Sequence, residues 1–202
     1  MLDVSTLTFR LKCRCAFSMF FAMQLLAKAL WTLIGILLLA GCGNSTAPQQ
    51  SAPATNAPAV DPIYGHLLHA QPRLPTIKVR IGSEELIAEI ARKEVEIATG
   101  MMFRTNMLEN EAMLFVFPRP AQRSFYMRNC VIPLSAAYIS PSGEILQIVD
   151  LHPGDEIGML SYSDNVQFVL EVRQNWFARH RIDVGAYVRT EKGSLQETFF
   201  GK

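Results

Sequence analysis

The stretch RSFYMRNCVIPL, residues 123–134, is the most informative part of this sequence. Basic, aromatic, sulfur and amide side chains alternate in it before an apolar run that is closed by a proline. If the stretch is a strand, Arg128 and Asn129 lie in mid-strand and face opposite sides. Asn129 then shares a face with Met127 and is buried if that face is the core, whereas Arg128 lies in solvent beside Tyr126.

The segments around this stretch predict a β-rich domain. Short apolar or alternating runs, separated by turns such as Gly82-Ser83 and Pro141-Ser142-Gly143, are typical of strands. The predicted strands are residues 76–81, 85–90, 111–117, 134–139, 144–151, 166–172 and 186–190. Two short helices are predicted at 91–100 and 175–181. About seven strands at close spacing favour a mainly β, single compact sandwich-like or barrel-like domain.

The segment VQFVLEV (166–172) gives the clearest strand pattern. Alternate residues from Val166 to Val172 are apolar, which predicts one core-facing side. Gln167 and Glu171 are predicted to face the other way.

The N-terminal part has the layout of a secretory signal. In AKALWTLIGILLLAGC (27–42) a lysine precedes an apolar run that is short for a membrane span, and small residues precede Cys42. Leu39-Ala40-Gly41-Cys42 resembles the lipobox of bacterial lipoproteins, which implies lipidation of Cys42, for example by palmitate, and cleavage before it. An uncleaved membrane anchor is the alternative.

These features predict four parts of the chain. Residues 1–42 form the signal peptide, and a second apolar patch in residues 1–22 suggests that translation starts at Met19 or Met23. Residues 43–72, rich in Pro, Ala and Ser at their start, form a flexible tether. The β-rich domain follows at 73–192, and 193–202 form a tail.

The net charge and the number of cysteines limit the partners and the disulfides that can be expected. From residue 43 onward there are 15 Lys and Arg against 17 Asp and Glu, so the segment carries a net charge of −2 and no basic face. A nucleic-acid partner is therefore not expected. Lipid at Cys42 leaves Cys130 without a disulfide partner, and burial is the default for such a thiol.

Three ordered blocks resemble a known prokaryotic family, Domain of Unknown Function 192. The blocks are Gly100-Met101-Met102-Phe103-Arg104, Met113-Leu114-Phe115-Val116-Phe117, and Phe125-Tyr126-Met127-Arg128-Asn129 with Pro133-Leu134. Val169-Leu170-Glu171-Val172 fits a further block, and the resemblance covers about residues 77–190. It implies a compact, mostly β domain that is often exported, and it implies no reaction.

The chain departs from this family at several positions. Ala112 stands where glycine is usual, and Cys130 stands where threonine is usual. Ser135 and Ala186 stand where relatives have aspartates. A mechanism that rests on those aspartates is not expected here, whereas ligand binding is less affected.

The leading functional prediction is a non-enzymatic binding or accessory module. Arg104, Arg128 and Asn129 could converge, with Tyr126 and Glu171, on a small anionic ligand or a peptide end, because arginine suits carboxylates. The structural alternative is that Asn129 bonds a loop backbone and one arginine pairs an acid such as Glu171.

Two other functions stay open. Met101, Met102, Met127 and Cys130 are soft ligands that could bind Cu(I), although methionine also fills irregular cores. Otherwise no cofactor is expected. An enzyme acting on envelope carbohydrate needs a pair of carboxylates that the sequence does not reveal.

The predicted location is the cell envelope, with the membrane contacted through the lipid at Cys42 and the domain facing the periplasm or the exterior. An envelope protein is a further possible partner. Gly43 stands where inner-membrane lipoproteins of enteric bacteria carry aspartate, which favours the outer membrane in a Gram-negative host.

Overall fold

The computed structural model describes residues 59–201. The predicted signal peptide, the start sites Met19 and Met23, Cys42 and the first part of the predicted tether lie outside these residues. Within them, no helix is long and apolar enough to cross a membrane.

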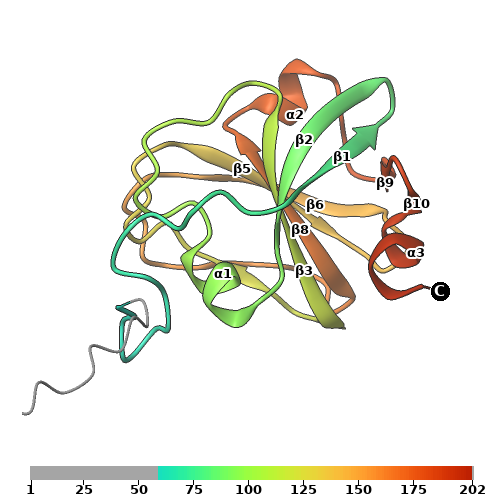
Figure 1. The fold of residues 1–202 in the computed structure, drawn as a ribbon. Coiled ribbons are helices and arrows are strands. Elements are labelled where there is room, and N and C mark those ends of the chain that lie inside the picture. The colour runs from blue at the N-terminus through green and yellow to red at the C-terminus, as the bar shows by residue number, and fades with distance from the viewer. Residues whose placement is uncertain (1–58, 202) are drawn as a thin grey trace, which may run out of the picture. The chain divides into compact units, whose positions relative to one another are not determined.

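Strands dominate the described domain, as predicted (Figure 1). Eight of them form one sheet in the order β10-β9-β1-β2-β3-β8-β5-β6, and β4 and β7 form a separate pair. The strands are β1 (Thr76–Ile81), β2 (Glu84–Ala91), β3 (Glu111–Ala121), β4 (Ser124–Phe125), β5 (Leu134–Ile139), β6 (Ile145–Leu151), β7 (Met159–Leu160), β8 (Val166–Arg173), β9 (Val188–Thr190) and β10 (Gly193–Ser194).

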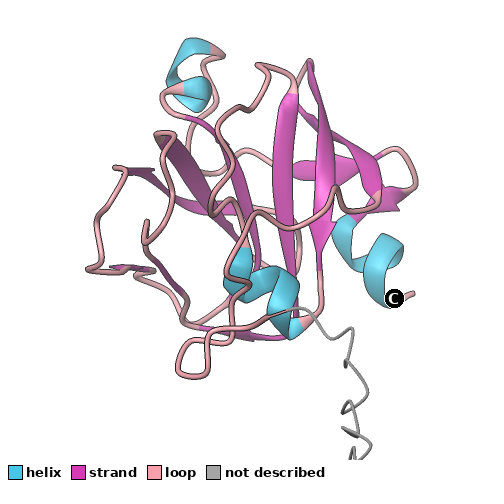
Figure 2. Cartoon of the chain, turned by 60° about the vertical axis from the view of Figure 1, so that its left-hand side comes forward, coloured by secondary structure: helices cyan, strands magenta, loops and turns pink. Residues whose placement is uncertain are grey.

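Three short helices lie around the strands (Figure 2). They are α1 (Glu94–Thr99), α2 (Trp176–Arg179) and α3 (Leu195–Phe200). The helix α3 corrects the prediction that 193–202 is only a tail. Ser194 caps this helix by accepting a hydrogen bond from the Glu197 N–H, and the Glu197 carboxylate accepts one from the Ser194 N–H in return.

Hydrogen bonds close the sheet on itself. Beyond the named strands, Glu144 and Tyr187 form an antiparallel bridge. The Ile145 N–H donates to the Ala186 carbonyl, and the Val188 N–H donates to the Gly143 carbonyl, both at 2.8 Å. The start of β6 therefore pairs with the start of β9, and the barrel-like alternative in the fold prediction is favoured over a sandwich.

Two apolar clusters form on opposite faces of the sheet. One face carries Ile77, Val79, Leu114, Phe168 and Leu170, which belong to the cluster inside the closed sheet. The other face of β3, β8 and β5 carries a second cluster, which includes Met113, Phe115, Ala136, Tyr138 and Val169.

Loop residues and α1 cover this second face. Met101, Met102, Phe125, Met127 and Cys130 pack there. For this reason β8 is buried on both faces rather than exposed on one: Gln167 and Glu171 face away from Phe168, as predicted, and yet both are buried.

The segment before β1 packs on the domain. His66, Leu67 and Gln71 are buried. The Leu67 N–H donates to Thr99 Oγ1 at 2.9 Å, and Gln71 Nε2 donates to the Gly100 carbonyl at 2.8 Å. Residues 59–72 are therefore part of the folded unit, in contrast to the predicted tether that reaches residue 72.

The structure corrects the central prediction for residues 123–134. Ser124–Phe125 form a short strand and Leu134 begins β5, whereas Arg128 and Asn129 lie in a turn. Asn129 has a positive φ of 57° and is exposed. It therefore does not lie in mid-strand and is not buried beside Met127. Its carbonyl accepts a hydrogen bond of 2.8 Å from the Phe103 N–H.

Candidate functional site

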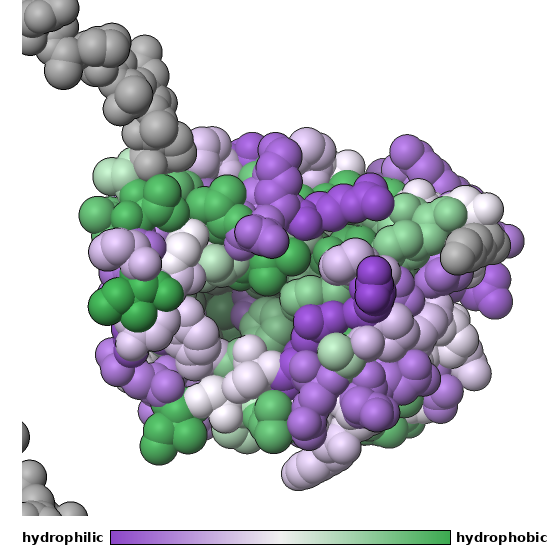
Figure 3. Space-filling model, turned by 90° about the horizontal axis from the view of Figure 1, so that it is seen from below, coloured by the Kyte–Doolittle hydropathy of each residue, from purple (hydrophilic) through white to green (hydrophobic). Residues whose placement is uncertain are grey.

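A pocket of about 290 Å³ opens between the second face of the sheet and the segments that cover it. Four parts of the chain supply its walls: the end of α1 with the following turn, β3, the β4 region and β8. Figure 3 shows the domain from the α1 side, where the surface is hollowed and apolar residues border the hollow. The walls are formed by Ile97, Ala98, Thr99, Met101, Met102, Phe115, Phe117, Gln122, Arg123, Ser124, Phe125, Tyr126, Cys130 and Glu171.

The turn after α1 directs two methionines into this pocket. Gly100 has φ 48°, a conformation that L side chains rarely adopt. A Cβ at this position would also lie 3.2 Å from the Phe115 ring. The Gly100 N–H donates to the Glu96 carbonyl and ends the helix, so the chain turns and buries Met101 and Met102.

Aromatic rings form the apolar part of the walls. Phe115 and Phe125 pack edge to face, with centroids 4.9 Å apart and planes at 83°. Phe117 meets Phe125 at 90°. Tyr126, which is half-buried, completes this side, and burial raises the pKa of its phenol.

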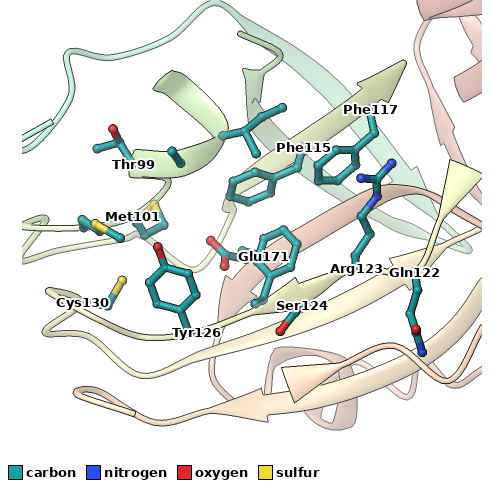
Figure 4. A pocket seen from close by; sticks show the side chains of 14 residues that line it. Thr99, Met101, Phe115, Phe117, Gln122, Arg123, Ser124, Tyr126, Cys130 and Glu171 are labelled. Carbon is teal, nitrogen blue, oxygen red and sulfur yellow. The ribbon is translucent and has the colours of Figure 1, made fainter. Parts of the chain in front are cut away.

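Glu171 is the acid of the pocket. Its residue is 4% exposed, and its Oε2 atom is buried without a hydrogen-bond partner among the described residues. Burial raises the pKa of this carboxyl to about 8. Figure 4 shows the carboxyl group between Phe115 and Tyr126, pointing into the pocket.

The Glu171 carboxyl contributes to the raised pKa values of two neighbouring groups. Burial, followed by the nearby Glu171 charge, raises the pKa of the Cys130 thiol to about 12. The same two causes raise the pKa of Tyr138. Cys130 is therefore a neutral thiol at physiological pH, as its predicted burial implies.

Arg123 lies at the other end of the pocket, beside Phe117 (Figure 4). Its guanidinium stacks 3.9 Å from the Phe117 ring centroid, and one of its nitrogens donates to the Arg119 carbonyl at 2.6 Å. Its Nε is buried and has no hydrogen-bond partner in the described part of the chain, and burial lowers the pKa of the group. The pocket thus contains an unpartnered donor and an unpartnered carboxyl oxygen.

The residues of the predicted anion site do not all lie together in the structure. Tyr126 and Glu171 line the pocket, but Arg104 pairs with Glu89, at 2.5 Å and 2.9 Å. Arg128 pairs with Glu156 at 3.0 Å and stacks 3.9 Å from the Tyr64 ring centroid. The alternative, in which an arginine pairs with an acid, is found with Glu89 and Glu156 as the acids, and no arginine among residues 59–201 pairs with Glu171.

The residues predicted to bind Cu(I) lie closer together than the residues predicted to bind an anion. Met101, Met102 and Cys130 line the pocket, and Met127 is buried in the same apolar cluster. Among residues 59–201, no group of three or more His, Cys, Asp and Glu side chains is placed to hold a metal ion.

Several pocket residues were not predicted from the sequence, namely Ile97, Ala98, Thr99, Phe115, Phe117, Gln122, Arg123, Ser124 and Phe125. The sequence signal for this pocket is the acid Glu171 within the mostly apolar strand 166–172, because a buried acid needs either a partner or a cavity. The sequence does not show which distant segments would meet it.

Ser135, which departs from the family pattern, is hydrogen-bonded to an acid on the neighbouring strand. Its hydroxyl donates to Asp150 Oδ1 at 2.5 Å and accepts from the Asn175 N–H at 2.9 Å. Asp150 lies opposite Ser135 on β6. A carboxylate is therefore present beside the position where relatives carry one, although it comes from the neighbouring strand.

The family profile of Domain of Unknown Function 192 (DUF192), described as Uncharacterized ACR, matches residues 77–190. The chain belongs to the DUF192 family. The resemblance found in the three sequence blocks is thereby confirmed, and the DUF192 match spans β1 to β9.

Two solved structures resemble the DUF192 domain. One, from Novosphingobium aromaticivorans and described as a protein of unknown function, is 31% identical, with a TM-score of 0.55 over 67% of this chain and 94% of that one. The other, from Sinorhizobium meliloti and provisionally described as a transcription regulator, is 25% identical, with a TM-score of 0.57 over 59% of this chain and 97% of that one. No protein with a curated description matches.

In both solved chains the matched domain makes up nearly the whole chain. In those two proteins a domain similar to this one therefore folds without a long preceding segment. The fragment 59–202 of this chain, which includes both apolar clusters, is accordingly suited to biophysical measurements.

Proposed function

We propose that the DUF192 domain is a non-enzymatic module that binds a small molecule in the pocket beside Glu171. The observation that carries this proposal is the unpartnered carboxyl oxygen of Glu171 in an aromatic-walled pocket. Apolar walls with a few converging polar groups are typical of ligand sites, and buried polar atoms in proteins almost always have partners.

The ligand chemistry differs from the anion suggested by the arginines. Arg104 and Arg128 already have carboxylate partners, whereas Glu171 Oε2 has no hydrogen-bond partner among residues 59–201. A ligand with a hydrogen-bond donor that reaches Glu171 therefore fits the geometry better than a simple anion. An acceptor on the ligand could in addition meet Arg123 Nε.

Native mass spectrometry of the fragment 59–202, purified without chelator, tests this proposal. A bound mass is expected that disappears in Ala98→Trp, which fills the pocket, and stays in Val184→Trp, an exposed control position. A bare mass in the unmodified fragment would count against tight binding of any molecule in the expression host.

A Cu(I) site is the second candidate, because Met101, Met102 and Cys130 share the pocket. A copper-bound cysteine is a thiolate, so binding must overcome the raised pKa of Cys130. Competition with a chromophoric Cu(I) chelator tests this candidate. Loss of Cu(I) binding in the double change Met101→Leu and Met102→Leu, with unfolding nearly unchanged, would favour copper over an organic ligand.

Carbohydrate hydrolysis is less well supported by the pocket. Glycosidases use two carboxyl groups on opposite sides of the bond, and Glu171 is the one carboxyl among the described wall residues. If Glu171→Gln abolished turnover of an envelope glycan while the fold stayed intact, the enzyme alternative would replace the binding module.

The envelope location is part of the same proposal. Its support is the sequence Leu39-Ala40-Gly41-Cys42 after an apolar run, which is typical of lipoproteins. Labelling of cells with an alkyne analogue of palmitate is expected to mark the full chain and not Cys42→Ser. Equal labelling of both, or of neither, would remove the anchor from the proposal.

A further inference from the structure

Among residues 59–201, no cationic side chain pairs with the Glu171 carboxyl. Its two neighbours across the sheet are Met113 on β3 and Ala136 on β5, and neither is charged. Burial, together with the charge of Glu171, raises the pKa values of Cys130 and Tyr138. Both groups are therefore neutral between about pH 6 and about pH 9. Half-buried Tyr126 also has a raised pKa.

Arg123, the cation in the pocket, does not act as the counter-ion of Glu171. It stacks on Phe117 at the other end, and the raised pKa of Glu171 has burial as its cause. A nearby cation would instead lower that pKa. The carboxyl is therefore available to an ion that enters the pocket from solvent.

The walls around the carboxyl suit a cation as well. Phe115, Phe117 and Phe125 line the pocket, and adjacent rings are turned nearly at right angles, so the ring faces point in more than one direction. Ring faces attract ammonium ions, and a desolvated contact is worth more than an exposed one. Apolar walls also exclude charged competitors that are strongly hydrated.

Resting on the proposed function above, we infer that the pocket ligand is a small organic ammonium ion, which pairs with the Glu171 carboxylate inside the aromatic walls. The protein carboxyl loses its proton to the bulk buffer as the ion binds. The ligand keeps its own proton, so the pair that forms is carboxylate and ammonium.

Benzylammonium, benzyl alcohol and benzoate provide a matched cation, neutral molecule and anion for the test. Binding of each to the fragment 59–202 is measured by calorimetry between about pH 6 and about pH 8, in buffers with different heats of ionisation. Benzylammonium is expected to bind tightest and to gain about tenfold in affinity per pH unit as Glu171 ionises. Near pH 6.5 about one proton should be released for each ion bound.

Two variants test whether Glu171 is the group that binds benzylammonium. Glu171→Gln is expected to weaken benzylammonium binding at least tenfold at about pH 8, to remove its pH dependence, and to leave benzyl alcohol within about twofold. Glu156→Gln, which removes an exposed carboxylate outside the pocket walls, is expected to change neither.

The outcomes separate the ligand class from the pocket itself. If benzyl alcohol binds as tightly as benzylammonium, or if Glu171→Gln leaves the cation's affinity unchanged, the ammonium inference is wrong and the binding pocket stands. Tighter binding of benzoate also overturns the inference and points to Arg123. Binding of none of the three overturns both proposals.

Discussion

Glu89 and Glu171 are nearly equally buried, at 3% and 4% exposed, but their surroundings are opposite. Both lie in one row across the sheet, since Glu89 on β2 is opposite Met113 on β3, and Met113 is opposite Glu171 on β8. Burial by itself raises the pKa of Glu89, but hydrogen bonds from Arg104, the Leu74 N–H and Arg73 outweigh it, so that the pKa is lowered. Glu171 has burial alone, and its pKa is raised.

This difference shows that position on the sheet does not decide the role of a buried acid. The turn after α1 brings Arg104 to Glu89 but brings the thioethers of Met101 and Met102 to the Glu171 pocket, where other segments add rings and a thiol near the carboxyl. One glutamate therefore fastens the segment before β1 to the sheet, through the Leu74 N–H, and the other is left in a pocket.

The largest expected effect comes from removing the charge of Glu171. Its pKa is raised in the folded state, so the folded protein holds the proton longer, and stability is lost as pH rises from the unfolded value of about 4.5 through about 8. At 1.36 kcal/mol per pKa unit the loss is at most roughly 5 kcal/mol. Glu171→Gln should therefore match the unmodified fragment near pH 5 and exceed it in stability near pH 9, as measured by urea unfolding.

Comparing the two proteins at each pH cancels the contributions of other carboxylates. If the free energies of unfolding of the unmodified fragment and of Glu171→Gln differ by the same amount from about pH 5 to about pH 9, the pKa of Glu171 is not raised by folding. Glu171 would then not differ from Glu89 in the way described above.

The next largest effect comes from removing the buried partner of Glu89. Arg104, whose side chain is 10% exposed, pairs with Glu89 at 2.5 Å, so Arg104→Met leaves a buried carboxylate without its main partner. We expect a loss of about 3 kcal/mol near pH 7, smaller in acid where Glu89 gains a proton. Urea unfolding at both pH values measures it.

Arg73→Met is the matched control. Arg73 also pairs with Glu89, at 2.7 Å, but its side chain is 64% exposed, so its removal should cost less than about 1 kcal/mol. Equal costs for the two substitutions would mean that solvent, rather than Arg104, compensates the charge of Glu89.

The smallest effect concerns the reactivity of Cys130, which is the one cysteine of the fragment 59–202. With a pKa of about 12, the thiol should react with iodoacetamide near pH 8 at least about a hundredfold more slowly than in the urea-unfolded fragment. Because burial is the larger cause and the Glu171 charge the smaller, Glu171→Gln should speed the native reaction by less than about tenfold. Fast alkylation of the native fragment would place Cys130 in solvent and open the pocket.

Much of the fold could be predicted from local sequence. Alternation and turn residues place the strands at 76–81, 134–139 and 166–172 within a residue of β1, β5 and β8, because side-chain period and backbone geometry are coupled locally. The helix α3 was missed, although Ser194 and Glu197 form its capping box, because the segment is short and lies at the end of the chain.

The stretch 123–134 shows where local pattern fails. Its apolar and aromatic residues resemble a strand, but the left-handed conformation of Asn129 ends any strand there, and its carbonyl bonds to Phe103 from a segment about 26 residues earlier in the chain. Its aromatic residue Phe125 is buried against Phe115 on β3. Tertiary contacts, rather than alternation, decide this conformation.

The sequence by itself determined the family, the β-rich class and the short list that contained Glu171, Tyr126 and Cys130, since these depend on local order of residue types. Only the tertiary structure decided which acid has a partner. The free energy of a buried carboxyl depends on the charges within a few ångströms of it, and those charges come from segments far apart in the chain: Arg104 reaches Glu89, and no described cation reaches Glu171.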